Sequence, residues 1–316
     1  MIAFVFPGQG AQKVGMGKSL AAAFPVCRDT FAEADAALDA SLSALCFEGP
    51  EDRLMLTENT QPAILAMSTA VCRLIEQEGI TPSYTAGHSL GEYSAHVASG
   101  TLSFADALRT VRRRGRYMQE AVPVGRGAMA AVLGLDAAAV DEACVDARAA
   151  SGLVVTPANL NAPGQVVIAG HADAVTKAGE HAKARGAKRV IPLAVSAPFH
   201  CPLMKPAEDR LAPELRGLGA RDPRVPVVAN VDAEPKRSAA EAIDALIRQV
   251  SLPVRWEDVV RRLIAEGART FVELGPGSVL AGLIKKIDRS VTVMSIDDET
   301  SLGHALGQLR ATASRD

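Results

Sequence analysis

The chain has 316 residues, of which 48% are apolar and 22% are charged, and its formal net charge is −2. This composition is ordinary for a globular enzyme, and the length allows one large core or a main domain that carries a smaller one. The small net charge gives no support to a role on nucleic acid, so we expect no nucleic-acid partner. No apolar run is long enough for a membrane-spanning helix, so we expect no membrane association.

The cysteines argue against two kinds of site. Their number is odd and no CxxC pair occurs, which disfavours both a disulfide framework and a zinc site. We therefore expect no metal and a reducing compartment, the cytoplasm. The apolar start, residues 1–7, lacks a basic leader and stops at Pro7, so it predicts a buried first strand rather than a signal peptide. The cysteines are Cys27, Cys46, Cys72, Cys144 and Cys201.

Short apolar runs predict a parallel sheet. Each run ends near a glycine or proline and is followed by a helical pattern, as buried parallel strands are. The helical patterns are amphipathic, for example over residues 61–77 and 256–266. Strands that alternate with helices predict the α/β class. The four runs are residues 2–6, 84–86, 227–229 and 270–273.

The middle of the chain has a different order of elements. Four strand patterns and two helical patterns follow one another as β-α-β-β-α-β, which is the ferredoxin-like split unit. We expect a small ferredoxin-like subdomain at residues 126–196, inserted into a large catalytic domain made of residues 1–125 and 197–316. Residues 311–316 are expected to fray. The strand patterns are residues 128–133, 153–160, 165–169 and 189–195, and the helical patterns are residues 136–149 and 172–184.

The stretch Gly87-His88-Ser89-Leu90-Gly91 is a G-x-S-x-G motif between the strand at 84–86 and an expected helix at 90–98. A sharp strand-to-helix turn of this kind lifts a serine oxygen off the end of the sheet, and the glycines allow close packing. The start of the helix supplies N–H donors for an oxyanion. We interpret Ser89 as a nucleophile in an α/β-hydrolase-like large domain. The alternative is a serine that merely caps a helix.

A serine nucleophile needs a base, and the histidines are the candidates. His88 precedes the serine and should point away from the substrate. His200 stands out because a loop bracketed by prolines, residues 196–202, holds it. On local sequence alone, His200 is equally well read as a histidine exposed to water. The other candidates, His96, His171, His181 and His304, are better read as packed or surface residues.

An arginine run and two glycine-rich turns complete the candidates. Most of the run is expected to be a solvated helix face, but one guanidinium turned into the cleft would bind a substrate carboxylate. The turns at 6–10 and 275–279 follow strands of the sheet, so they share an edge with Ser89. Neither turn completes a dinucleotide-binding G-x-G-x-x-G fingerprint, and Gln9 is the residue in them best placed to face the cleft. The run is Arg109, Arg112, Arg113, Arg114 and Arg116.

Taken together in this order, the motifs resemble the malonyl-CoA:acyl carrier protein transacylase family and the related acyltransferase domains of polyketide synthases. The resemblance covers nearly the whole chain. It is carried by Pro7-Gly8-Gln9-Gly10, by Gly87-His88-Ser89-Leu90-Gly91-Glu92, by Arg114-Gly115, by Asn161-Ala162-Pro163-Gly164-Gln165, by Phe199-His200, by Gln249 before Pro253-Val254-Arg255-Trp256, and by Gly275-Pro276-Gly277.

The resemblance implies a ping-pong mechanism. Ser89 attacks the thioester of malonyl-CoA while His200 takes its proton, and the backbone N–H groups of Gln9 and Leu90 form the oxyanion hole. The thiol of an acyl carrier protein then attacks the malonyl-serine ester. Arg114 is implied to hold the malonyl carboxylate. The carbonyl of Gln249 is implied to orient the histidine, so no third carboxylate is expected.

The resemblance also bears on selectivity and assembly. A branched residue after the serine and a phenylalanine before the histidine match the malonyl-type pattern, and Leu90 and Phe199 fit it. Leu252, where many members have asparagine, and His96, at a commonly apolar position, depart from the pattern. We expect CoA to enter only as a thioester substrate, with no cofactor, and the protein to be a monomer. The pathway, fatty acid or polyketide, stays open.

Two other functions compete with this one. A serine hydrolase shares the elbow, but it expects an acid and then a late histidine, for which His304 is the available residue. A non-catalytic module could recruit carrier protein through the arginine run. Transfer of the acyl group to a thiol rather than to water would exclude the hydrolase, and an acyl group on Ser89 would exclude the module.

Overall fold

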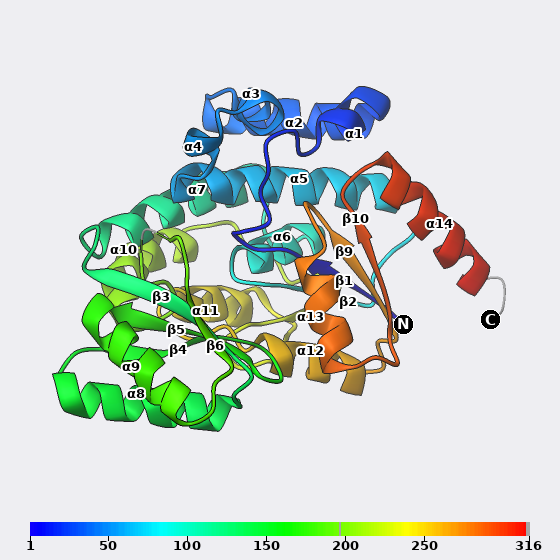
Figure 1. Ribbon diagram of the computed structural model, residues 1–316. Coiled ribbons are helices and arrows are strands. Elements are labelled where there is room, and N and C mark those ends of the chain that lie inside the picture. Colours follow the sequence, from blue (N-terminus) through cyan, green and yellow to red (C-terminus); the bar gives the residue numbers. More distant parts are fainter. Residues whose placement is uncertain (196, 314–316) are drawn as a thin grey trace.

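The computed structural model describes residues 1–195 and 197–313, and within them the strands form two sheets (Figure 1). The larger sheet has six strands in the order β10-β9-β1-β2-β7-β8. The first five are parallel to their neighbours, and β8 runs antiparallel to β7. Its strands are β1 Ile2–Phe6, β2 Tyr84–Gly87, β7 Val227–Val228, β8 Pro235–Lys236, β9 Thr270–Leu274 and β10 Thr292–Ile296.

Each of the four predicted parallel strands is present, with bounds that differ by one residue at most. The unpredicted strands, β8 and β10, lie at the two edges of the sheet. The inner strands could be predicted from the sequence because a strand buried on both faces requires a continuous apolar run. In β1, Phe4 and Phe6 pack into one core, while Ala3 and Val5 pack into the core on the opposite face.

Helices cover both faces of the large sheet (Figure 1). The first core includes buried side chains of α5, α6 and α7, and the second includes those of α12 and α13. Helix α5 begins four residues before the predicted start. It contains Pro62, which has no backbone N–H to donate and whose side chain is buried. The helices around this sheet are α1 Lys18–Ala23, α2 Pro25–Leu38, α3 Leu42–Glu48, α4 Glu51–Leu54, α5 Thr57–Gln77, α6 Leu90–Ala98, α7 Phe104–Glu120, α10 Lys205–Arg216, α11 Ala239–Gln249, α12 Trp256–Ala265, α13 Val279–Ile287 and α14 Glu299–Ala313, with a 3₁₀ turn at Pro202–Met204.

The smaller sheet is antiparallel throughout, in the order β4-β5-β3-β6. Two helices, α8 Ala137–Ser151 and α9 Ala172–Ala184, bury their apolar faces with it in a third core. The element order and types match the prediction for this region. Its strands are β3 Gly127–Leu133, β4 Val155–Ala162, β5 Gln165–His171 and β6 Arg189–Pro192.

Several bounds differ from the predicted ones. β6 ends at Pro192 rather than 195, and Leu193 and Val195 line a pocket instead. β4 continues to Ala162, where a bridge between Asn159 and Val254 ties the small sheet to the segment before α12. Helix α14 runs to Ala313, within the tail that was expected to fray, and residues 314–316 and 196 lie outside the described residues. No helix in the described ranges is long and apolar enough to cross a membrane.

Candidate active site

The elbow predicted around Ser89 is present. β2 ends at Gly87 and α6 begins at Leu90, with Ser89 between them at φ 53° and ψ −106°. This backbone region is strained for a residue with a side chain, and such strain persists only where packing enforces it. A Cβ on Gly87 would lie 1.9 Å from the carbonyl carbon of Gly91, and one on Gly91 would lie 2.0 Å from the Phe6 oxygen. The two glycines therefore allow the turn to close.

His200 lies against the serine, as a base must. Its Nε2 is 2.6 Å from Ser89 Oγ, and its Nδ1 is 2.9 Å from the carbonyl oxygen of Gln249. Burial, and next the charge of Arg114, lower the pKa of His200 to about 3, so the ring is neutral near pH 7. Since the carbonyl can only accept, Nδ1 carries the proton and Nε2 is left to accept from the serine.

Arg114 is the one member of the arginine run that turns inward. Its side chain is 1% exposed, and its Nη1 donates to Gln61 Oε1 at 2.8 Å. Its Nη2 donates to Ser89 Oγ at 3.1 Å and to Gln249 Oε1 at 2.9 Å. Gly115 permits this placement, because a Cβ there would lie 2.7 Å from the Thr57 oxygen on α5. By contrast, the exposed members Arg113 and Arg116 pair with Glu214 and Glu58.

The backbone N–H groups of Gln9 and Leu90 come from two strand ends at the same sheet edge. Gln9 follows β1, and Leu90 is the first residue of α6. Gly8 lets the first loop press on the elbow, since a Cβ there would lie 2.4 Å from the His88 oxygen. Within residues 1–195 and 197–313, neither N–H donates to a protein acceptor. Both donors are therefore available to a bound oxyanion.

Comparison with known proteins decides the family. Residues 3–312 match the family described as acyl transferase domain. A malonyl CoA-acyl carrier protein transacylase of Bacillus subtilis (strain 168) is 50% identical over 309 residues, covering 98% of this chain and 97% of that protein. The enzyme of the same name from Escherichia coli (strain K12) is 51% identical over 305 residues, covering 96% and 98%. The chain belongs to the malonyl CoA-acyl carrier protein transacylase family.

Solved structures of this transacylase family have the same fold. An acyl carrier protein S-malonyltransferase from Vibrio cholerae O1 biovar eltor superposes with a TM-score of 0.94 at 48% identity, covering 96% of this chain and 99% of that one. A malonyl-transacylase in complex with a type II PKS acyl-carrier protein also gives 0.94, at 49% identity and with 97% and 99% coverage. The resemblance stated from the motifs is thus confirmed, as is the mixed α/β architecture with a parallel and an antiparallel sheet.

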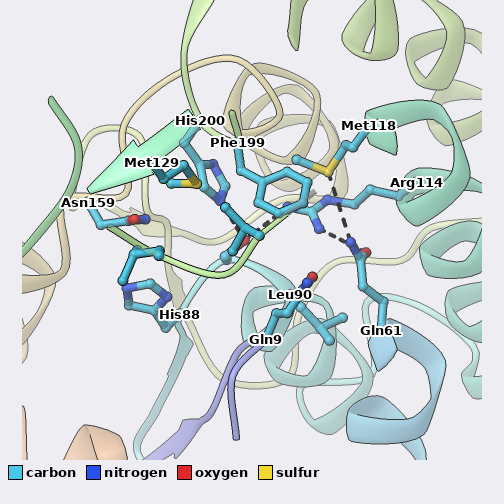
Figure 2. Close-up of a pocket in the computed structure, with 13 residues that line it drawn as sticks. Gln9, Gln61, His88, Leu90, Arg114, Met118, Met129, Asn159, Phe199 and His200 are labelled. Atoms are coloured by element: carbon cyan, nitrogen blue, oxygen red, sulfur yellow. Dashed lines mark hydrogen bonds between the residues drawn. The ribbon is translucent and has the colours of Figure 1, made fainter. Parts of the chain in front are cut away.

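In this transacylase family member the groups described above meet at a cavity of about 120 Å³ (Figure 2). Gln61, Arg114 and Met118 lie toward one end, and His88 and Asn159 lie toward the other. Phe199 also lines it and is largely buried. No group of three or more His, Cys, Asp or Glu side chains in the described ranges is arranged to hold a metal ion.

The expectation that His88 points away from the site is wrong. Its ring lines the cavity, and its Nε2 lies 2.8 Å from Asn161 Oδ1 on β4. Side chains alternate only while a strand continues, and the turn at Ser89 breaks that alternation. Of the remaining histidines, His96 is fully buried in α6, its two ring nitrogens have no partner among the described residues, and burial lowers its pKa to about 3.

Asn230 and the side chain of Gln249 were not predicted as parts of the site. Asn230 Oδ1 accepts from the Ser89 N–H at 2.7 Å, and Asn230 Nδ2 donates to the Gly87 oxygen at 2.7 Å. Gln249 Nε2 donates to the Ser89 oxygen at 2.9 Å. Asn230 could have been predicted as a site residue, because it is a polar residue that follows the buried strand β7. β7 ends at the sheet edge that carries Ser89.

Proposed function

We propose that this chain moves a malonyl group from malonyl-CoA to the phosphopantetheine thiol of an acyl carrier protein, for fatty acid or polyketide synthesis. One observation carries the proposal: Ser89 Oγ lies 2.6 Å from His200 Nε2 and 3.1 Å from Arg114 Nη2. A hydroxyl that touches both a neutral base and a guanidinium suits the covalent transfer of an acyl group with its own carboxylate. The names of the relatives agree with this chemistry.

In the first half-reaction, Ser89 Oγ bonds to the thioester carbonyl carbon as His200 Nε2 takes the hydroxyl proton. The N–H groups of Gln9 and Leu90 stabilise the oxyanion. The C–S bond then breaks, His200 returns the proton to the CoA sulfur, and a malonyl-serine ester remains. The Gln249 carbonyl keeps the imidazole in the tautomer that both proton transfers need.

In the second half-reaction, the carrier-protein thiol gives its proton to His200 and attacks the ester carbonyl. The C–O bond breaks, and Ser89 recovers its proton from the imidazolium. A wider groove of about 560 Å³, which shares Gln9 and Val195 with the inner cavity, offers the thiol-bearing arm a route inward.

Arg114 binds the malonyl carboxylate in this scheme. Its guanidinium is buried and touches neutral oxygens, and no ion pair joins it to a carboxylate in the described ranges. A substrate carboxylate would supply that missing charge with two parallel hydrogen bonds. Phe199, beside the same cavity, restricts room for an α-methyl group and so favours malonyl over methylmalonyl.

The scheme uses CoA only as a thioester substrate, because Ser89 and His200 carry every proton and electron pair, so we propose no cofactor. We also propose a monomer, since all the site residues named come from one chain. A cytoplasmic location is supported by the five cysteines, which are free and buried as in proteins of reducing compartments. Neither nucleic acid nor membrane is among the proposed partners.

We further propose that the chain divides into a large α/β-hydrolase-like domain, residues 1–125 and 197–316, and a ferredoxin-like subdomain, residues 126–196. The order of β3, α8, β4, β5, α9 and β6 supports the second description. The parallel sheet with an elbow after β2 supports the first. One face of the small sheet shares a core of its own with α8 and α9, while Met129, Val167 and Ala169 on its other face pack into the core that includes α5, α6 and α7.

Among the described residues, neither the acid nor the late histidine that a serine hydrolase needs lies at the site. The imidazole of His200 is oriented by a backbone oxygen, and His304 is exposed on α14 away from the residues that line the cavity. The binding-module alternative leaves the contact between Ser89 and His200 without a purpose.

Intact-protein mass spectrometry tests the proposal. After incubation with malonyl-CoA, we expect one malonyl group on the wild type and none on Ser89→Ala, and the group should then pass to holo acyl carrier protein. An unmodified wild type would overturn covalent catalysis, and loss of the group to water faster than to the thiol would favour a hydrolase.

A further inference from the structure

Glu92, on the first turn of α6, has no part in the scheme above, yet it lies at the centre of the site's hydrogen bonds. It is 0% exposed, and its Oε2 accepts from Gln249 Nε2 at 2.8 Å and from the Asn230 N–H at 2.9 Å. We propose that Glu92 is a positioning residue: its Oε2 holds the Gln249 side-chain amide, and through it the Arg114 guanidinium, where the substrate carboxylate arrives. This inference rests on the proposed role of Arg114.

The Gln249 amide has one favourable orientation. Its NH₂ group donates to Glu92 Oε2 and to the Ser89 oxygen, and its Oε1 accepts from Arg114 Nη2 at 2.9 Å. Rotated by half a turn, the amide would set its NH₂ against the guanidinium and its oxygen against two acceptors. Glu92 thus anchors the donor end of the amide that presents an oxygen to Arg114.

The same oxygen of Glu92 also secures the elbow. Glu92 Oε2 accepts from the backbone N–H of Asn230. The side chain of Asn230 in turn accepts from the Ser89 N–H and donates to the Gly87 oxygen. One buried acceptor therefore joins the ends of β2, β7 and α11. Loss of that acceptor leaves two buried donors unpaired, which is costly and is relieved by movement of the Gln249 side chain and of the Asn230 backbone.

The other oxygen of Glu92 shows whether the neighbours need a hydrogen-bond acceptor or a negative charge. Glu92 Oε1 is buried and has no partner among the described residues. Burial raises the Glu92 pKa to about 7, against the opposing hydrogen bonds from Gln249 and Asn230. A proton on Oε1 would leave both accepted bonds at Oε2 intact. The acceptor atom, rather than a full negative charge, is therefore what the neighbours require, and a glutamine could provide it.

Three variants test this inference: Glu92→Met, which keeps the volume but removes the acceptor, Glu92→Gln, which keeps an oxygen, and Glu273→Met as a matched control. Glu273 is also 0% exposed with a pKa raised to about 7, but it binds the start of α13. Single-turnover loading of malonyl-CoA and of acetyl-CoA is followed by mass spectrometry. The ratio of the two rates is independent of the folded fraction.

We expect the malonyl-to-acetyl ratio to fall about tenfold in Glu92→Met, the loss of one good hydrogen bond to a charged group. Glu92→Gln should keep the ratio within about threefold, and Glu273→Met should leave it unchanged. A wild-type ratio in Glu92→Met would overturn the inference, and so would a Glu92→Gln variant as impaired as Glu92→Met. If Arg114→Ala also left the wild-type ratio unchanged, the proposed role of Arg114 itself would fail. Absence of malonyl loading in the wild type would instead remove the proposed function.

Discussion

Two strand-to-helix connections at one edge of the large sheet look alike but differ in chemistry. β2 leads to α6 through Ser89, and β9 leads to α13 through Ser278, each serine being the N-cap of its helix. A fully buried glutamate lies beside each connection, Glu92 on the first turn of α6 and Glu273 in β9, and burial raises the pKa of each to about 7.

The difference lies in where their partners come from. Glu273 accepts from the Leu280 and Ala281 N–H groups and from Ser295 Oγ, which lies 22 residues away, so it stabilises the start of the next helix and joins it to β10. The distant partners of Ser89 and Glu92 lie from 25 to 160 residues away along the chain. A serine at a helix start thus becomes a candidate nucleophile only where distant segments bring a base and a guanidinium to it.

The largest expected effect is the difference in malonyl transfer between variants of the two serines. Ser89→Ala should lower malonyl transfer to holo acyl carrier protein about a thousandfold or more, because no covalent intermediate can form. Ser278→Ala, at the exposed N-cap of α13, should stay within about twofold of the wild type. The initial rate of carrier-protein labelling measures both, and similar losses in the two variants would refute the contrast between the connections.

The guanidinium beside Ser89 has no counterpart at Ser278 in the described ranges. Arg114→Ala should lower kcat/KM for malonyl-CoA about a hundredfold, the loss of a charge-assisted carboxylate contact. Hydrolysis of the malonyl-enzyme should accelerate, because the ester geometry is no longer fixed. Arg113→Ala, on the same helix but exposed, is the matched control. An unchanged rate of hydrolysis of the malonyl-enzyme in Arg114→Ala would contradict the proposal that Arg114 fixes the ester geometry.

The base beside Ser89 makes a prediction about pH. Burial lowers the pKa of His200 to about 3 from an ordinary 6.5, which disfavours its protonated form. The neutral imidazole therefore persists as pH falls through 6.5, and kcat/KM for malonyl-CoA should be nearly constant from pH 7 to pH 5. With the ordinary pKa of a histidine, kcat/KM would fall about 25-fold over that range. A pH profile with an acid limb near 6.5 would contradict the burial effect.

The smallest expected effect concerns the acyl group. Methylmalonyl-CoA should react with a kcat/KM about tenfold below that of malonyl-CoA, a typical penalty for one extra methyl group in a tight pocket. Phe199→Ala should narrow the gap by removing the ring that lines the cavity. Steady-state kinetics with both thioesters measures this, and equal kcat/KM values in the wild type would refute the role of Phe199.

The sequence by itself determined the features that repeat along one segment. Apolar runs marked the inner parallel strands to within a residue, and glycine spacing marked the elbow around Ser89. The ordered motifs were specific enough to indicate the family and, with it, His200 and Arg114. Such patterns are readable because burial of a strand and closure of a tight turn restrict the residue types at each position.

Only the tertiary structure decided which distant side chains meet. Asn230 binds the Ser89 N–H across 141 residues of chain, and Glu92 binds Gln249 across 157. Because of the turn at Ser89, the His88 ring lines the cavity, although the alternation of side chains along a strand predicted the opposite side. Periodicity reports which face of a segment is buried, but the sheet order determines which segments share an edge, and the hydrogen bonds at that edge depend on it.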